Sequence, residues 1–303
     1  MKDHPATVVV IGAANIDIFA RPNTSHTMYD SNPGHVHIAH GGVGRNIVEN
    51  LARLDMKPLF LTALAGDMDG VAIRQCLEDL GATVCAITHA HSNRYVAMLD
   101  QRGELLLAVA DMAGLEVMDA DFLHQHRSAL TQASSLVLDA NLPDVTWSWL
   151  IEHVATPIYA DAISVAKADR LKPYRQNIHT LKVNRFEASV LSGEHPDAPP
   201  EMHIAALLGF GITEVFLTLG EHGAMHGSSQ GIRHMPSFIK QTNIVNATGA
   251  GDAFMSGVIY ANQHKKDSLT YGLAMSSISL RSRDAVSPAL NVKRLEDTVK
   301  EDL

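Results

Sequence analysis

The sequence predicts an α/β protein with a mostly parallel central sheet that helices cover on both faces. Short apolar segments of strand length alternate with segments whose apolar residues recur at helical spacing, which is typical of such sheets. Two stretches, about residues 16–39 and 93–111, break this rhythm and predict a small antiparallel sheet over one end of the main sheet. Surface loops plus an edge hairpin are the alternative interpretation. The 303 residues are enough for a large core and a cleft, and we expect one domain over residues 1–303.

The individual elements follow from apolar spacing and turn residues. In residues 46–54 the apolar side chains fall on one side of a helix, and Gly81 is a typical end for the helix expected at 71–80. Further helices are expected at 147–154, 185–191 and 250–262. Strands are expected at 7–11, 58–65, 94–99, 104–109, 135–139, 157–160, 180–183 and 214–219, the pair at 94–109 as a hairpin.

Composition and charge exclude several classes of partner. The chain is 46% hydrophobic and 19% charged, as ordinary globular proteins are, and its net charge of −9 argues against a nucleic-acid groove. The apolar run at residues 8–11 is far shorter than the roughly 20 residues of a membrane span, and no signal segment precedes it. Two cysteines are too few for a disulfide framework. We therefore expect a cytoplasmic protein without membrane or nucleic-acid partners.

The most informative segment is residues 246–252 (NATGAGD), which leads into the helix expected at 250–262. A glycine-rich turn at a helix start exposes unpaired backbone N–H groups, and the helix dipole adds positive potential there. Such a place can hold the negative charge of a phosphoryl group in transfer, and Asp252 could accept a proton from an attacking hydroxyl. The structural alternative is a simple helix cap, since Asp is common there and glycine turns precede many helices.

Two earlier turns carry polar residues near a helix start or a strand end. Residues 41–46 (GGVGRN) would let substrate hydroxyls approach the backbone, with Asn46 as both donor and acceptor; a tight turn before a helix is the alternative. Residues 11–17 (IGAANID) lack the further glycines of a dinucleotide fingerprint. Asn15 and Asp17 instead form a polar pair at the carboxyl end of a strand, where open α/β sheets bind ligands.

Two later strand ends could meet a nucleotide. Asn184 and Glu187 are three residues apart, so they could hold a hydrated Mg²⁺, or equally form a capping box. Residues 217–223 (LTLGEHG) end a strand in a glycine turn where backbone could contact phosphate or ribose. The absence of a GxxxxGKS or GxxxxGKT loop excludes a Walker-type site. The 17 histidines show no cluster at structural-zinc spacing.

In this order, the segments resemble the ribokinase-like (PfkB) family of carbohydrate kinases from end to end of the chain. The matching motifs are Asn-x-Asp at 15–17, GGxGxN at 41–46, Asn-x-x-Glu at 184–187, Thr-x-Gly at 218–220 and GAGD at 249–252. The resemblance implies the ribokinase-like three-layer α/β/α fold, with a small β-sheet lid formed by about 16–39 and 93–111. It also implies an ATP-dependent phosphotransferase that acts on an alcohol group of a sugar or nucleoside.

The resemblance further implies roles for the matched residues. Asp252 would be the base that removes the hydroxyl proton. The anion hole would be formed by the amides of Gly249, Ala250 and Gly251. Substrate hydroxyls would be held by Asn15, Asp17, Gly42 and Asn46. The nucleotide would be lined by Thr218, Gly220 and Gly223, with Asn184 and Glu187 organising the Mg²⁺–triphosphate region and Glu187 reaching the ion through water.

A monovalent cation is a further implication of the resemblance. Many relatives bind such an ion, for example K⁺, beside the anion hole. Backbone oxygens near Asn246 and Thr248 and in the segment 283–287 would supply the ligands here. ATP, Mg²⁺ and K⁺ are therefore the cofactors that the resemblance implies.

Within the family, four segments resemble the bacterial pseudouridine kinases. They are residues 30–34 (DSNPG), 41–47 (GGVGRNI), 178–182 (IHTLK) and 243–249 (NIVNATG). The subgroup implies pseudouridine 5′-phosphate as the product, with the lid residues Asp30 and Ser31 bound to the uracil edge. Ala162 and Val183 stand where prolines are expected, which weakens the assignment to the subgroup but not to the family.

Two other hypotheses stay open. The protein could be a kinase of the same fold that acts on ribose, a fructose phosphate, adenosine or inosine. A phosphorylated sugar needs cations near the lid, and Arg21, Arg45 and Arg94 are the candidates. The protein could also be a ligand sensor without activity, although its GAGD segment is intact. In each case the edge of the lid could pair with a second copy to form a homodimer.

Overall fold

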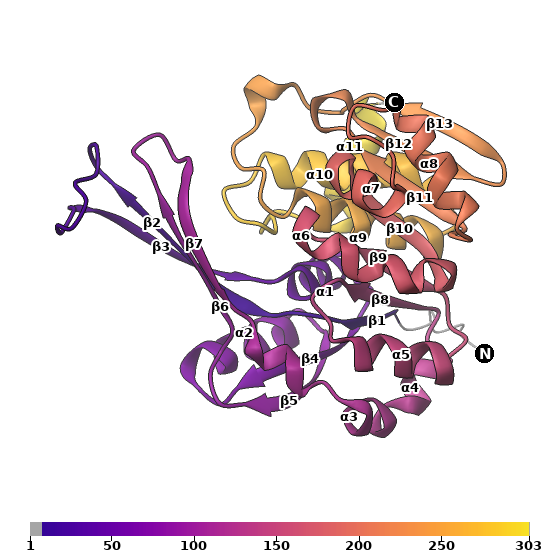
Figure 1. The fold of residues 1–303 in the computed structure, drawn as a ribbon, viewed down its shortest axis with the longest axis horizontal. Coiled ribbons are helices and arrows are strands. Elements are labelled where there is room, and N and C mark those ends of the chain that lie inside the picture. The colour runs from indigo at the N-terminus through magenta and orange to yellow at the C-terminus, as the bar shows by residue number, and fades with distance from the viewer. Residues whose placement is uncertain (1–7, 303) are drawn as a thin grey trace.

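The computed structural model of the protein describes residues 8–302, so Thr7, the first residue of the strand expected at 7–11, lies outside the described residues. Their main body is a nine-stranded sheet between two layers of helices (Figure 1). From β11 to β5 the strands are parallel, while β12 and β13 join one edge antiparallel. In spatial order the strands are β13 (Gly231–Met235), β12 (Ala224–Ser228), β11 (Glu214–Thr218), β10 (Ile178–Asn184), β9 (Ile158–Asp161), β8 (Ser135–Asp139), β1 (Val8–Ile11), β4 (Leu59–Ala65) and β5 (Thr83–His89). The predicted α/β class with a mostly parallel sheet is confirmed.

The central strand β1 shows why the sequence forms this sheet. All four of its residues are apolar and buried, as expected for a strand that is covered on both faces. Val9 and Ile11 belong to one hydrophobic cluster, while Val8 and Val10 belong to the other. The core therefore lies on both sides of the sheet, because successive side chains of a strand point to opposite faces.

The helices divide between these two clusters. The first face is covered by α3 (Ala120–Gln125), α4 (Arg127–Gln132), α5 (Asp144–His153), α6 (Val165–Ala168), α7 (Arg185–Ser192) and α8 (Pro200–Gly209). The second face is covered by α1 (Val43–Arg53), α2 (Met68–Asp79), α9 (Ala250–Gln263) and α10 (Ser268–Leu280), with α11 (Val292–Asp302) packed outside them. Short 3-10 helices occur at Ala113–Val117, Asp169–Asn177, Gly220–His222 and Gln241–Asn243. None of the helices between residues 8 and 302 has the length and apolar character needed to span a bilayer.

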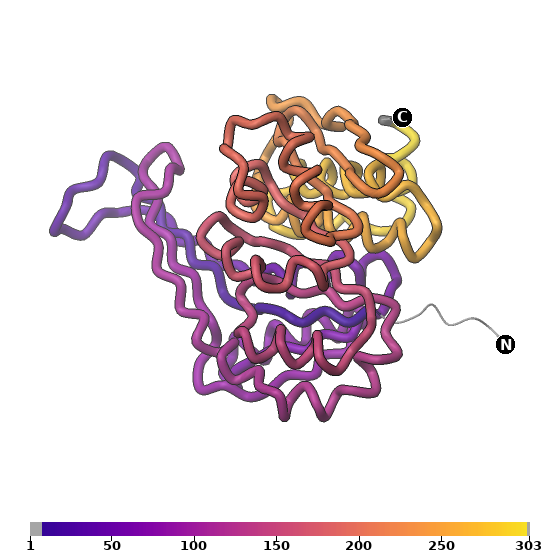
Figure 2. The backbone as a smooth tube through the Cα atoms, turned by 45° about the vertical axis from the view of Figure 1, so that its right-hand side comes forward, coloured from indigo at the N-terminus to yellow at the C-terminus, as the bar shows by residue number. Residues whose placement is uncertain are grey.

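A separate four-stranded sheet, called the lid below, projects from one side of the body (Figure 2). Its order is β3 (Gly34–Gly41), β2 (Asn15–Pro22), β6 (Arg94–Leu99) and β7 (Leu105–Asp111). The expectation of an antiparallel sheet was wrong for its centre, where β2 pairs with β6 in parallel. The reason is topological: β2 continues from β1 and β6 follows β5, and these two strands leave the same edge of the parallel sheet.

Candidate active site

The first turns of α1 and α9 meet at the carboxyl edge of the sheet. Asn46 Nδ2 donates a hydrogen bond of 2.8 Å to Asp252 Oδ2, although the two residues are 206 positions apart. Both side chains are buried. The sequence named both residues, and the structure brings them into direct contact.

Helix α9 begins with a glycine that the geometry requires. Gly249 is the N-cap residue with a φ of 79°, and a Cβ at this position would lie 2.2 Å from the carbonyl oxygen of Ala285. The first helical bond runs from the Ala253 amide to the Gly249 carbonyl at 2.9 Å. The amides before Ala253 therefore precede the helical ladder, where donors can face an anion, although the Ala250 amide also makes a long contact of 3.4 Å with the Ala247 carbonyl.

Helix α1 begins at Val43, three residues earlier than expected. Gly42 turns the chain with a φ of 99°, and a Cβ there would lie 2.5 Å from the Ala13 carbonyl oxygen. Asn46 therefore stands inside the helix, one turn from its start. Arg45 Nη1 donates to Asn46 Oδ1 at 2.7 Å. Because a guanidinium has only donors, this contact leaves the Asn46 amide nitrogen to face Asp252.

The environment of Asp252 suits a general base. Burial raises the pKa of Asp252 to about 7, and the charge of Asp161 acts in the same direction. The Lys182 ammonium and the hydrogen bond from Asn46 oppose this rise. A base is most effective when its pKa lies near the working pH, so this carboxylate is matched to proton transfer near neutrality.

Three charged residues near Asp252 were not predicted from the sequence to belong to the site. Lys182 Nζ, at the end of β10, forms a buried ion pair of 2.8 Å with Asp161 Oδ2 at the end of β9. Asp139, at the end of β8, accepts hydrogen bonds from the amides of Ala13 and Asn141 at 3.1 and 2.9 Å, and burial raises its pKa to about 6. The sequence held a signal for the two acids, because Asp139 and Asp161 stand at the ends of expected strands. That is the sheet edge where α/β proteins bind ligands.

The polar pair Asn15 and Asp17 lies where the lid meets the body. Asn15 Nδ2 donates to Asp17 Oδ1 at 2.6 Å, and burial raises the pKa of Asp17. A cavity of about 330 Å³ joins Asp17 to Asn246 and Thr248 of the α9 turn. Asp17, expected at the substrate, therefore shares a cavity with Asn246 and Thr248, which were expected beside the cation.

Asp30 and Ser31 are the expected substrate residues that the structure does not bring to Asp252. They lie in the loop between β2 and β3, at the far end of the lid (Figure 1). Both are exposed, and the Ser31 amide donates to Asp30 Oδ1 at 2.7 Å. Any contact with a substrate at Asp252 would need a change in the position of the lid.

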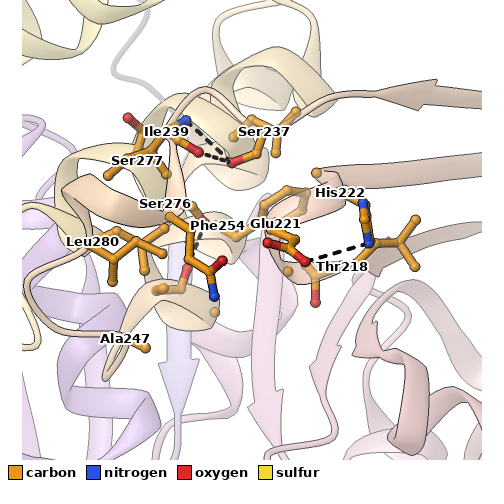
Figure 3. A pocket seen from close by; sticks show the side chains of 18 residues that line it. Thr218, Glu221, His222, Ser237, Ile239, Ala247, Phe254, Ser276, Ser277 and Leu280 are labelled. Atoms are coloured by element: carbon orange, nitrogen blue, oxygen red, sulfur yellow. Dashed lines mark hydrogen bonds and ion pairs between the residues drawn. The ribbon is translucent and has the colours of Figure 1, made fainter.

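A second cavity, of about 530 Å³, also touches the α9 turn (Figure 3). Thr218, Gly220 and Gly223, which the resemblance assigned to the nucleotide, form one wall, and Ala250 and Gly251 extend it to the start of α9. The opposite wall includes Ser276 and Leu280 of α10, and Phe254 of α9 lies between the two walls. The volume falls within the range of pockets that bind cofactors and other small molecules.

Asn184 and Glu187 form the capping box that was the structural alternative. Asn184 Oδ1 accepts hydrogen bonds from the amides of Phe186 and Glu187 at 2.9 and 3.0 Å, and Glu187 Oε2 accepts one from the Asn184 amide at 2.8 Å. The box occupies one oxygen of each side chain. Burial raises the pKa of Glu187, while the nearby charge of Lys182 lowers it.

The segment expected to hold a monovalent cation is packed against the loop that follows α10. Asn246 Nδ2 donates to the Arg283 carbonyl at 2.8 Å, and the Thr248 amide donates to Asn246 Oδ1 at 2.9 Å. Among residues 8–302, no group of three or more His, Cys, Asp and Glu side chains has the arrangement of a metal site.

A buried carboxylate beside a glycine-led helix start, with two cavities lined by residues of that turn, is the arrangement expected of a transferase that brings two small molecules together. The comparisons with known proteins give the same class. The model of the pfkB family carbohydrate kinases matches residues 5–291, and the chain belongs to this family.

Individual relatives agree with this assignment. The pseudouridine kinase of Escherichia coli is 32% identical over 302 residues, which cover 97% of this chain and 96% of that protein. The crystal structure of a putative sugar kinase from Clostridium perfringens has a TM-score of 0.84 and 29% identity, covering 99% of this chain and 97% of that one. A putative ribokinase II from E. coli, solved in complex with ATP and Mg²⁺, has a TM-score of 0.83 at 17% identity, over 98% and 99% of the two chains, which shows the shared fold.

The protein is therefore an ATP-dependent phosphotransferase with an alcohol group as acceptor, and it has the ribokinase-like fold. The predicted family and the predicted class of enzyme are confirmed.

Proposed function

We propose that the protein transfers the γ-phosphate of ATP to the 5′-hydroxyl of pseudouridine. The observation that carries the choice of substrate is the 32% identity to the E. coli pseudouridine kinase over nearly the whole of both chains. The substrate is thus a small molecule, and we expect the protein to act in the cytoplasm without nucleic acid or membrane.

In this proposal Asp252 is the catalytic base. The substrate oxygen forms a bond to the γ-phosphorus while the bond between that phosphorus and ADP breaks, and the hydroxyl proton passes to Asp252. The amides of Gly249, Ala250 and Gly251 hold the charge on the phosphoryl oxygens. The buried position of Asp252 and its pKa of about 7 support this role.

The two cavities give the reactants separate places. The nucleotide takes the cavity of about 530 Å³ at Thr218, Gly220 and Gly223. The acceptor takes the cavity below the lid, where the hydroxyls are held by Asn15, Asp17, Gly42 and Asn46, of which Asp17 lines the cavity directly. The α9 turn links the two cavities to Asp252, because Asn246 and Thr248 line the acceptor cavity and Gly251, the neighbour of Asp252, lines the nucleotide cavity.

The residues present also fit the metal ions of the proposal. Glu187 keeps one carboxylate oxygen outside its capping box, and Mg²⁺ needs few protein ligands because it retains several waters. When bound, Mg²⁺ would neutralise charge on the triphosphate. For K⁺, the Ala285 carbonyl lies directly against Gly249, so backbone oxygens near Asn246 and Thr248 and in the 283–287 loop are close together.

We also propose that the lid forms a homodimer through its outer face. One cross-strand row on this face is Ile38, Ile18, Val96 and Val109, and the next is Val36, Ala20, Met98 and Leu107. The side chains of Val36, Ile38, Leu107 and Val109 are each more than half exposed. An apolar sheet face of this kind needs a cover, and the inner face, which carries Asp17, already serves the acceptor cavity.

A sugar phosphate fits less well as the acceptor. The arginines that could bind its phosphate have other partners: Arg45 pairs with Glu49, Arg94 with Asp69, and Arg21 donates to the Gln101 carbonyl. Asp30 and Ser31 make no such contacts with the described residues of the body, so they could reach a uracil ring when the lid closes. Closure of the lid would also exclude water from the phosphate.

The decisive experiment is an ATP-dependent assay across pseudouridine, uridine, ribose, inosine, adenosine and fructose phosphates. We expect the highest kcat/KM with pseudouridine. Phosphorylation of ribose or a fructose phosphate without activity on pseudouridine would reject the proposed substrate and retain the class of enzyme. A protein that binds pseudouridine but phosphorylates none of the panel would instead be a sensor.

The proposed homodimer is tested separately by light scattering, with Leu107→Lys as the variant that should disrupt it.

A further inference from the structure

Lys182 is a buried cation whose charge lowers the pKa of the proposed base, and no sequence motif gave it a role. We propose that Lys182 is a positioning residue that keeps the Asp252 carboxylate ionised, so that Asp252 can accept the hydroxyl proton of the substrate. This inference rests on the proposed role of Asp252 as the base.

The geometry places the Lys182 ammonium directly beneath the first turn of α9. A Cβ added to Gly251, the residue before Asp252, would lie only 2.8 Å from Lys182 Nζ. The absence of a side chain at Gly251 therefore leaves the space that the ammonium occupies. Strand β10 ends here, so the stem of Lys182 is fixed by the sheet and its charge cannot swing away without breaking the 2.8 Å contact with Asp161.

The surroundings of Lys182 keep it protonated. Burial alone would lower its pKa, but Asp161, Glu187 and Asp252 together raise it above the ordinary value for a lysine. Lys182 therefore carries a full positive charge near neutrality. A buried charge of this kind requires several acidic partners at close range, and Asp252 is one of them.

Without Lys182, the charged groups that face Asp252 would all be acidic. The groups that face Asp252 from the elements packed around it are Asp139 on β8, Asp161 on β9, Lys182 on β10 and Asn46 on α1. Both aspartates and burial favour the protonated carboxyl, whereas Lys182 is the cation among these groups. An opposite charge within about 4–6 Å typically lowers a carboxyl pKa by about 1–3.

A purely structural role is the competing explanation. Lys182 and Asp161 are register partners in neighbouring strands, so their ion pair could serve only to tie β10 to β9. In that case a substitution would reduce stability, and any loss of rate would be the same at every pH. The two explanations therefore differ in their pH dependence.

The test uses two variants with opposite expected signs, Lys182→Met and Asp161→Asn. The ionisation of Asp252 is followed in the ligand-free full chain by infrared difference titration, with Asp252→Asn subtracted to assign the carboxyl band. We expect Lys182→Met to move this ionisation to higher pH by about one to three pH units, and Asp161→Asn to move it to lower pH. With the acceptor found in the substrate panel, the acid limb of the kcat/KM profile should move in the same directions.

The expected loss of rate in Lys182→Met at pH 7 is at least roughly fivefold, and it should shrink towards pH 9 as Asp252 ionises again. An unmoved Asp252 titration in Lys182→Met, or a rate loss of equal size from pH 6 to pH 9, would overturn the inference. If Lys182→Met does not fold, Asp161→Asn alone decides. In that variant, an Asp252 ionisation that moves to higher pH or does not move would contradict the inference. The infrared arm needs no substrate, so it tests Lys182 even if the proposed kinase reaction fails.

Discussion

Helices α1 and α9 begin in similar ways but treat their buried charges differently. Each follows a glycine with positive φ, 99° at Gly42 and 79° at Gly249. In α1, the buried Glu49 pairs with Arg45 and, at 2.7 Å, with Arg53. In α9, Asp252 is bound by the neutral amide of Asn46 and faces two further acids, and Lys182, which already pairs with Asp161, only partly offsets them. The first helix compensates its charges, whereas the second keeps a carboxylate in an unfavourable environment.

This difference indicates that the start of α9, rather than the start of α1, is the reactive one. A buried charge that is fully paired contributes to the structure of the fold, and removing one partner leaves the other without compensation. A buried carboxylate with a raised pKa destabilises the folded state but can take up a proton near neutrality. Substitution of the paired Glu49 in α1 should therefore act mainly on stability, and substitution of Asp252 mainly on rate.

The largest expected effect is the loss of turnover in Asp252→Asn. The amide has nearly the same shape and cannot accept the proton, so kcat should fall by about 10²–10⁴ while substrate affinity is nearly unchanged. Steady-state kinetics and calorimetric binding measure the two quantities. The matched control is Asp297→Asn, which removes an exposed acid paired with Lys293 on α11 and should leave kcat unchanged. Undiminished turnover in Asp252→Asn would show that another group is the base.

The next largest effect concerns stability in α1. Glu49→Gln removes the buried carboxylate between Arg45 and Arg53 and should lower the free energy of unfolding by roughly 3 kcal/mol. Denaturant unfolding at pH 7 measures this change. The control is Glu78→Gln on α2, where the pair with Arg74 is largely exposed and a change below about 1 kcal/mol is expected. Equal effects at the two positions would contradict the compensating role of Glu49.

The sequence was sufficient to single out two residues in glycine-rich turns that the structure brings into contact. Asn46 and Asp252 were named from separate segments, because each turn exposes backbone at a helix start and carries a polar residue one turn later. Lys182 and Asp161 were not part of the predicted site, although both lie near the ends of expected strands, because a single charged residue there does not show which other charges it will meet. Their importance comes from the parallel register that places β9 beside β10, which is a tertiary property.

The fold was predictable to a similar degree. The central parallel strands were found because they are continuously apolar. Helix α10 was not, because its residues are buried nearly all round and leave no polar face to mark a helical period. The parallel pairing of β2 with β6 depends on where two distant hairpins leave the body, and local patterns do not contain this information.

A smaller effect on rate should follow when the contact between the two helices is removed. Asn46→Ala deletes the hydrogen bond to the Asp252 carboxylate, so the pKa of that carboxyl should rise further. At pH 7 we expect kcat/KM to fall by roughly tenfold, the usual worth of a hydrogen bond to a charged group. The loss should decrease towards pH 9, where Asp252 is ionised in both proteins. A loss that does not change with pH would mean that Asn46 acts only on the substrate.

The smallest effect returns to stability, with the opposite sign from that in α1. The folded state raises the pKa of Asp252 from 3.8 to about 7, so the folded protein binds the proton more tightly than the unfolded chain does. Stability of the natural protein is then lost as pH rises from about 4 to about 7, and the full cost of the ionised carboxylate is present at pH 8. Asp252→Asn avoids this cost, so its Tm should exceed that of the natural protein by a few degrees at pH 8.

At pH 5 Asp252 is protonated in the folded protein, and the difference in Tm between the two proteins should become small. Calorimetry at both pH values measures this dependence, and Glu49→Gln should show a lower Tm than the natural protein under both conditions. A Tm of Asp252→Asn below that of the natural protein at pH 8 would mean that ionised Asp252 is stabilised by its surroundings. The contrast between a compensated α1 and a strained α9 would then be wrong.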